Sequence, residues 1–208
     1  MDEPRAAWRT TTHDWASTVD LDHLARIRRD PAVFAPGGLP HLILEVVAYA
    51  ADEAECNGGG HCRITLHDDG SVTVTDDGRG TDTRLDEHGE FVKKPVIATE
   101  DVRFFDRADA PLLPDGHHRR GMSTLAALST WLVHTNRRSN GSWTQRYEHG
   151  VPSTDLQPVP DDGTTGTSVR FLPDRSLLIA GRATRHHLAQ LTASWPHLSV
   201  DVDDHRTT

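Results

Sequence analysis

The stretch over residues 72–81, VTVTDDGRGT, constrains the fold of this 208-residue chain more than any other. Valine and threonine alternate in its first half, which predicts a strand with one apolar and one polar face. The strand ends in the carboxylates Asp76 and Asp77, and the glycines Gly78 and Gly80 follow. A carboxylate beside a glycine turn suits a purine, because the carboxylate accepts from an exocyclic amine and glycine lets the backbone approach the ring closely. Asp-Asp-Gly is also an ordinary turn, so the stretch alone leaves both interpretations open.

The segment over residues 39–56 has the clearest helical pattern. Its apolar residues recur at helical spacing, at Leu42, Ile43, Val46, Val47 and Ala50. Glu45 and Tyr49 are four residues apart and share a face with the acidic pair at 52–53. The glycine-rich residues 57–60 are predicted to end this helix, as glycine commonly does.

The rest of the chain predicts shorter elements. A helix begins at Asp20 and ends before Asp30, because the residue before a proline disfavours the helical region. Residues 81–120 show no period, which is typical of a functional lid or a partly disordered segment. The other predicted elements are a hairpin over 64–74, a helix from Gly121 through Leu132, hairpin strands over 133–136 and 142–148, a strand over 167–171, a helix over 182–195 and a strand over 198–202.

Charge and composition exclude several classes of protein. The 31 acidic residues outnumber the 22 basic ones, which argues against direct binding of a nucleic acid backbone. No apolar run is long enough to cross a membrane, and the N-terminus lacks a secretory signal pattern, so we expect a cytoplasmic protein with no membrane partner. Cys56 and Cys62 are expected as free thiols, with a disulfide across their loop left open, and no zinc ligand set stands out.

The order of these pieces resembles the ATP-binding domain of the B subunits of DNA gyrases, in the GHKL family of ATPases. The resemblance covers most of the chain, and its motifs lie at 44–47, 52–54, 60–62, 76–80, 128–132, 147–152 and 165–167. It implies an α+β fold of the GHKL (Bergerat) type. In this fold a two-layer α/β sandwich has a mixed sheet covered by helices on one face. It also implies a nucleotide held between the helices and the lid.

The resemblance assigns roles to individual residues of this chain. Glu45 takes the position of the general base, which orients and deprotonates the water that attacks the γ-phosphate. Asp76 takes the position of the adenine-binding carboxylate, and Gly121 that of the last phosphate-loop glycine at a helix N-terminus. Arg79 is expected to pair with Glu53 and wall the pocket. The full set implied to bind the nucleotide is Val46, Tyr49, Glu53, Val74, Asp76, Gly78, Arg79, Gly80, Thr81, Arg119, Arg120, Gly121 and Thr167.

The chain also departs from the family pattern. Tyr49 replaces the asparagine that holds Mg²⁺, and a phenol is a poor ligand for a hard cation, so no residue is assigned to a metal and Mg²⁺ is doubtful as a cofactor. Arg119 replaces the middle glycine of the phosphate loop, where it or Arg120 can supply charge to a phosphate. The proline after Gly-Arg-Gly is replaced by Thr81-Asp82, and Thr144 stands where an arginine is expected.

These features predict a module that binds ATP or ADP, with weak or lost Mg²⁺-dependent hydrolysis. Two alternatives stay open. The first is an active ATPase of the type II topoisomerase kind. The second is a repurposed pocket for another small molecule, or a regulator that associates with gyrase.

Two segments are expected along the chain. Residues 1–17, with Trp8 and Trp15, read as a flexible N-terminal arm, and residues 18–208 as the nucleotide-binding domain, with no transducer or DNA-cleavage domain. The arm suggests a homodimer or a partner protein docked through it.

Overall fold

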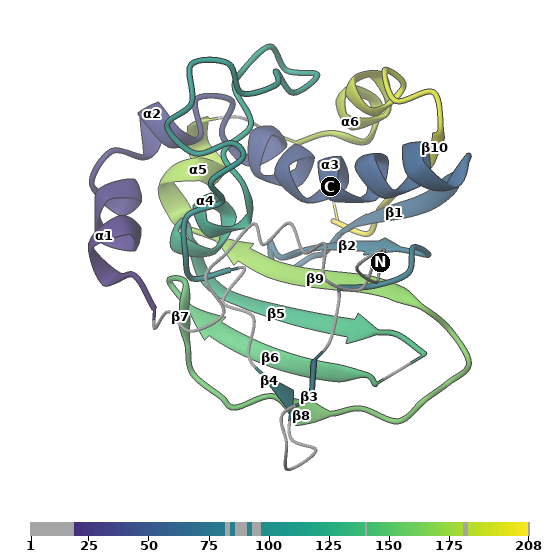
Figure 1. Cartoon of the computed structure of the whole chain (residues 1–208). Helices are drawn as coiled ribbons and strands as arrows, with labels where there is room; N and C mark the ends of the chain where they lie inside the picture. The colour runs from purple at the N-terminus through teal and green to yellow at the C-terminus, as the bar shows by residue number, and fades with distance from the viewer. Residues whose placement is uncertain are drawn as a thin grey trace, which may run out of the picture.

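The computed structural model describes residues 19–81, 84–85, 91–92, 97–139, 141–180 and 183–207. The predicted arm over 1–17 and Asp82 lie outside this part of the chain. The described residues form an α+β structure in which helices lie on one side of a mixed eight-stranded sheet (Figure 1), so the predicted fold class is confirmed. None of the helices among them combines the length and apolar character that crossing a bilayer requires.

Six helices are described: α1 (Leu21–Arg29), α2 (Pro31–Phe34), α3 (Leu39–Asn57), α4 (Met122–Ala127), α5 (Arg175–Ala180) and α6 (Arg185–Thr192). The large sheet contains β1 (Gly60–Leu66), β2 (Val72–Asp76), β5 (Ser129–Arg137), β6 (Trp143–Glu148), β7 (Val151–Pro152), β8 (Gln157–Pro158), β9 (Gly166–Pro173) and β10 (Leu198–Asp204). A separate pair consists of β3 (Arg84–Leu85) and β4 (Phe91–Val92).

The sheet is mixed because of one edge. Its strand order is β10-β1-β2-β9-β5-β6-β7, with β8 paired to β6. Strand β10 runs parallel to β1, and all other pairs in this sheet are antiparallel. The β1–β2 hairpin matches the prediction, and its turn ends at Gly70, which has the positive φ of 81° that glycine accommodates.

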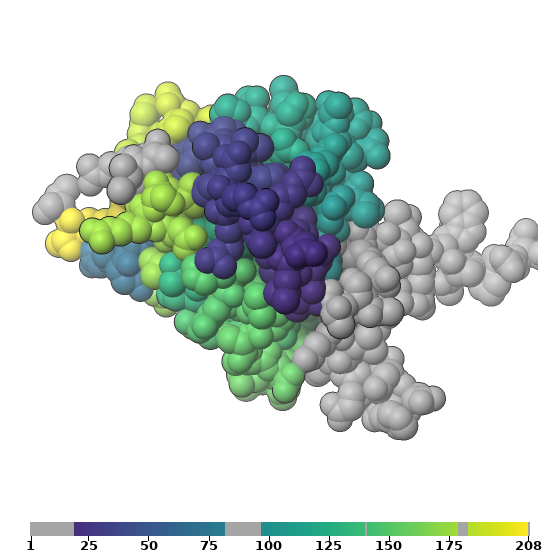
Figure 2. All heavy atoms as spheres, turned by 90° about the vertical axis from the view of Figure 1, so that its left-hand side faces the viewer, coloured from purple at the N-terminus to yellow at the C-terminus, as the bar shows by residue number. Residues whose placement is uncertain are grey.

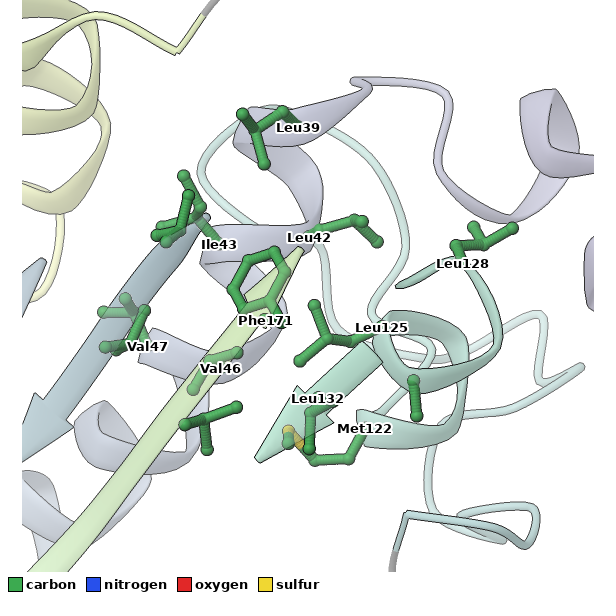
Figure 3. Packing of buried hydrophobic residues seen from close by; sticks show 14 of the residues in the cluster. Leu39, Leu42, Ile43, Val46, Val47, Met122, Leu125, Leu128, Leu132 and Phe171 are labelled. Carbon is green, nitrogen blue, oxygen red and sulfur yellow. The ribbon is translucent and has the colours of Figure 1, made fainter. Parts of the chain in front are cut away.

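The core lies between α3, α4 and the sheet. Leu42 and Val46 of α3, Leu125 of α4 and Phe171 of β9 belong to one buried cluster (Figure 3). Leu42, Leu125 and Phe171 are completely buried. Burying a side chain of this size stabilises a fold by roughly 1.5–3 kcal/mol, so the apolar stripe that predicted α3 also fixes α3 on the sheet.

Two predicted boundaries are wrong. The helix expected from Gly121 through Leu132 ends at Ala127, and Leu132 lies in β5, because the following residues alternate between the buried and the partly exposed face. This period of two favours a strand over a helix. The helix expected over 182–195 is described as α6 only over Arg185–Thr192, where Thr184 caps its first turn; α5 and α2 were not predicted.

Helices α1 and α2 brace the segment that follows residue 100. The ring of Phe105 stacks on Phe34 of α2 at a centroid distance of 5.4 Å and meets His23 of α1 at 4.3 Å. Arg26 of α1 also forms an ion pair with Asp106. Figure 2 shows α1 and α2 on the same face of the molecule as this segment. The contacts hold the segment against α3, where the candidate site lies.

Both cysteines are unpaired. Cys56 is exposed near the end of α3 and Cys62 is buried in β1, so the disulfide left open by the sequence does not form.

Candidate functional site

The site has two ends, which we name by their residues. The sheet end comprises His134, Thr167, Val169, Asp76 and the turn over 78–81. The loop end comprises Glu45, Tyr49, Asp101, Arg119 and Gly121, where α3 meets the segment that leads into α4.

Asp76 stands at the last position of β2 and faces the helix layer. One carboxylate oxygen accepts from the Gly78 amide at 2.9 Å, and the other accepts from the Thr167 hydroxyl on β9. Burial raises the pKa of the Asp76 carboxyl, and the hydrogen bonds from Thr167 and Gly78 only partly offset this effect. A carboxylate offers about four acceptor positions, so Asp76 retains the capacity to accept from a ligand.

The turn after Asp76 needs its second glycine. Gly80 has a φ of 77°, and a Cβ there would collide with the carbonyl oxygen of Arg137. Asn136 of β5, which is fully buried, holds the next residue from both sides: its Oδ1 accepts from the Thr81 amide at 2.6 Å, and its Nδ2 donates to the Thr81 carbonyl at 3.2 Å. Strand β5 therefore fixes where the turn ends.

Arg79 and Glu53 form the ion pair that the resemblance implies. The Arg79 Nη2 atom donates to Glu53 Oε2 at 3.0 Å, and its Nε donates to Oε1. These hydrogen bonds lower the pKa of Glu53 to about 2. The Arg79 side chain is 64% exposed, so the pair walls the site without contributing much stability.

Two cavities adjoin the sheet end. One of about 70 Å³ is lined by Val46, Tyr49, Thr81, Ile97, Met122, His134, Thr167 and Val169. The other, of about 170 Å³, is lined in part by Glu53, Asp76, Gly78 and Arg79. Val74 is buried beneath the site, paired across the strands with Val169, and lines neither cavity.

Glu45 is completely buried at the loop end, facing inward from α3. Its Oε1 accepts from the Arg120 amide at 2.5 Å and its Oε2 accepts from the Gly121 amide at 2.8 Å. The Arg120 side chain turns away and lies 3.8 Å from Asp106. The carboxylate expected to act as a base thus caps the backbone amides expected to face a phosphate.

His41 lies one helical turn before Glu45 and is also completely buried. Its Nδ1 is 2.7 Å from Asp115 Oδ2, and its Nε2 is 3.5 Å from Glu45 Oε1. Burial alone lowers the pKa of His41, but the facing carboxylates of Asp115 and Glu45 raise it to about 9. A protonated His41 therefore balances the carboxylates of the buried Glu45 and the partly buried Asp115 around neutral pH.

Tyr49 donates from its hydroxyl to Asp101 Oδ2 at 3.0 Å. Asp101 is 1% exposed and also binds the Arg103 guanidinium through both oxygens, at 3.0 and 2.7 Å. Burial and then the Asp101 carboxylate raise the pKa of Tyr49 above its usual range, so the phenol stays protonated. A protonated phenol bonded to a carboxylate does not fit Mg²⁺, and no cluster of three potential ligands occurs among the described residues.

Arg119 is 4% exposed and lies within the loop end. Its Nη1 donates to Asp52 at 2.8 Å. Its guanidinium lies 4.3 Å from the ring centre of Tyr49 and 4.0 Å from that of Phe104. The Nε and Nη2 atoms are buried and have no hydrogen-bond partner in the part of the chain that the structure describes.

Sequence reasoning missed Asp101, Asn136 and His134. Asp101 lies in the segment without a period, and its contacts depend on the bracing of that segment by α1 and α2. Asn136 and His134 lie on β5, whose beginning was taken as helix. Their alternation with Leu132 is the signal that indicates a strand and places all three on its buried face.

Comparison with known proteins places the chain among larger relatives. No family model matches it. It is 34% identical to the B subunit of a DNA gyrase from Synechocystis, over 93% of this chain and 19% of the relative. It is 33% identical to the B subunit of the Thermotoga maritima DNA gyrase (88% and 30%), and 30% identical to the B subunit of the Bacillus subtilis DNA topoisomerase 4 (76% and 25%). The matches thus span less than a third of each of these relatives.

Proposed function

We propose that this chain, which is a GHKL domain of the gyrase B type, binds an adenine nucleotide, ATP or ADP, with weak or lost Mg²⁺-dependent hydrolysis. The observation that carries the proposal is the contrast inside the site. The sheet end has an acceptor with spare capacity, and the loop end has Tyr49 in place of the metal ligand and the buried Arg119 in place of a phosphate-loop glycine.

The sheet end supports binding of the base. The partly buried Asp76 carboxylate is positioned by Thr167 and Gly78 and can accept further hydrogen bonds, as an exocyclic amine requires. Gly80 and the clamp from Asn136 keep the turn in the shape that leaves this edge open. Val46, Tyr49, Thr81 and Thr167 line the adjoining cavity, and Glu53 and Arg79 wall the other side.

The loop end supports binding of phosphate without a metal. Arg119 stands where the family has a phosphate-loop glycine, and its Nε and Nη2 form one edge of the guanidinium fork that no described residue bonds. That edge matches two oxygens of a phosphate in a bidentate arrangement. Both atoms are buried, so we propose that a phosphate reaches them when the segment around Phe104 moves.

The position of Glu45 supports weak or lost hydrolysis. A general base has to contact the attacking water, but each carboxylate oxygen here is held by a backbone amide, and His41 lies beside it. Tyr49 is a poor ligand for Mg²⁺, which weakens metal-dependent hydrolysis further. In this proposal Glu45 holds the phosphate loop closed. ATP hydrolysis requires the hydrogen bonds from the Arg120 and Gly121 amides to Glu45 to break first.

The arrangement of segments is part of the same proposal. Residues 1–17 act as an N-terminal arm and residues 18–208 as the nucleotide-binding domain. The arm joins either a second copy of the chain or a partner protein, and the net charge of −9 argues against direct nucleic acid contact.

The test is isothermal titration of ADP into the wild-type chain and the Asp76→Asn variant. The amide presents a donor to the amine and leaves it unpaired, so we expect affinity to fall at least about a hundredfold. Asp68→Asn is the matched control, because Asp68 lies in the exposed β1–β2 turn, lines neither cavity and accepts from Thr207, which an asparagine carbonyl can also do. Equal ADP affinity in wild type and Asp76→Asn would refute the proposal.

A further inference from the structure

His134 lies on the floor of the 70 Å³ cavity. It belongs to β5, where it is paired with Val169 of β9 on one side and with Gln145 of β6 on the other. Its side chain is 6% exposed and shares the cavity with the Thr167 hydroxyl that binds Asp76. It is thus a polar residue in a row that is otherwise apolar at Val74 and Val169.

The imidazole of His134 makes no hydrogen bond to the described residues. Its backbone carbonyl accepts from the Thr144 hydroxyl at 3.2 Å, and its ring meets Trp143 edge-on at a centroid distance of 5.0 Å. The side chain of Gln145 is already bonded to Thr154 and Tyr147. Buried polar groups in folded proteins nearly always have partners, so a ring that faces a cavity without one among the described residues indicates a ligand.

The protonation state of the ring limits what it can bind. Burial lowers the pKa of His134 to about 4, so the ring is neutral at physiological pH. A neutral imidazole carries one N–H donor and one acceptor nitrogen. It can therefore hydrogen-bond an uncharged heterocycle, and it brings no positive charge to a phosphate.

The sheet register places His134 diagonally across the floor from Asp76, because His134 pairs with Val169 and Val169 pairs with Val74, two residues before Asp76. Asp76 ends β2, β9 lies next to it, and β5 lies beyond β9. Two strand spacings correspond to about 10 Å. The two residues of offset along the strand add about 7 Å. A flat ring that lies diagonally over Thr167 and Val169 turns one edge towards Asp76, which lines the 170 Å³ cavity, and the opposite edge towards His134 in the 70 Å³ cavity.

Resting on the proposed function, we infer that His134 hydrogen-bonds a ring nitrogen of the bound base, on the edge away from the amine that Asp76 binds. The ligand class is thereby narrowed to planar heterocycles with polar atoms on two opposite edges, as purines have. His134 acts as a specificity residue of the pocket and takes no part in phosphate chemistry.

The test uses adenosine and its 1-deaza, 3-deaza and 7-deaza analogues, each of which replaces one ring nitrogen with C–H. All four are titrated calorimetrically into wild type, His134→Leu and His134→Gln. One analogue is expected to bind wild type roughly tenfold more weakly than adenosine and to bind His134→Leu as well as adenosine does. His134→Gln keeps a donor and an acceptor and should recover part of the discrimination.

The control is Thr135→Val, the next residue on β5, whose hydroxyl bonds Thr144 and which points away from the cavity. It should leave all four affinities unchanged. If adenosine binds but each analogue shows the same ratio to adenosine in wild type and His134→Leu, the inference is overturned and the proposed function stands. If neither adenosine nor ADP binds wild type, both are overturned.

A thermal melt of the ligand-free protein separates this role from a structural one. Leucine removes a polar group from the core, so His134→Leu should melt at the same or a higher temperature than wild type. A lower melting temperature together with unchanged analogue ratios would show that His134 serves only the fold.

Discussion

The sheet end and the loop end of the site are built in opposite ways. At the sheet end, Asp76 and His134 border cavities and retain unused hydrogen-bonding capacity. At the loop end, Glu45 and Asp101 are saturated by neighbouring amides and side chains of the same chain. The sheet end can therefore accept hydrogen bonds from a base, while internal contacts close the loop end, where the phosphates are expected.

Three side chains close the loop end by bonding α3 to the segment before α4. Tyr49 takes the Asp101 carboxylate as a partner, Arg119 binds Asp52, and Glu45 takes the amides at the start of α4. Each contact joins α3 to the segment over 97–121. The loop end is therefore a set of links between helix and lid, and a ligand that enters it has to replace them.

The largest effect is expected from Glu45→Gln at the loop end. The glutamine amide would face backbone N–H groups and His41 would lose one carboxylate, so the free energy of unfolding should fall by about 3 kcal/mol. Urea denaturation measures this change. Glu55→Gln, on the exposed side of α3, is the control and should change stability little. A loss below about 0.5 kcal/mol for Glu45→Gln would mean that Glu45 does not close the loop.

The free energy of unfolding should also change with pH, by a smaller amount. Because the pKa of His41 is raised from 6.5 to about 9, its contribution is complete below about pH 6.5 and is lost as pH rises through 9. Stability from this group should drop by about 2–3 kcal/mol over that range. Denaturation of wild type and Asp115→Asn at pH 6.5 and 9 measures it, and the variant should show a smaller drop. Equal drops would exclude the His41–Asp115 pair as the cause.

Arg119→Met tests the metal-free phosphate contact. We expect ADP to bind about tenfold more weakly while adenosine binds as before, because only the phosphates gain from the guanidinium. Both ligands are titrated into both proteins, with Arg107→Met as the charge-matched control, because Arg107 is exposed and pairs with Asp109 away from the loop end. An equal loss for adenosine and ADP would indicate that Arg119 supports the fold of the site and leaves the phosphates alone.

The smallest change in stability and affinity is expected from a substitution at the sheet end. Arg79→Met breaks the exposed pair with Glu53, and its cost in stability should stay below about 1 kcal/mol. Affinity for adenosine should change less than threefold in the same titration. A larger loss of affinity would mean that Arg79 contacts the ligand directly.

Much of the fold and of the sheet end could be predicted from local sequence patterns. The apolar stripe and glycine stop placed α3 to within one residue, and the alternation in residues 72–76 placed β2. The pairing of Arg79 with Glu53 followed from the family resemblance. These features depend on residues close in sequence or on motifs whose spacing is fixed.

The closure of the loop end could not be predicted, because it depends on contacts between distant segments. Tyr49 and Asp101 are 52 residues apart, and Glu45 and Gly121 are 76 apart. The segment that carries Asp101 has no period, so no pattern places it beside α3. The early end of α4 was missed because Leu128 and Leu132 fit a helical stripe as well as a strand.

The most direct measurement is titration of ADP and a non-hydrolysable ATP analogue into wild type and Tyr49→Asn, each in Mg²⁺ and in EDTA. With Tyr49 in the place of the metal ligand and Arg119 available to the phosphates, wild-type affinity should be the same in both buffers. Tyr49→Asn supplies an amide oxygen and should bind the ATP analogue more tightly in Mg²⁺. Wild-type binding that strengthens several-fold in Mg²⁺ would contradict the account and restore a conventional metal-dependent site.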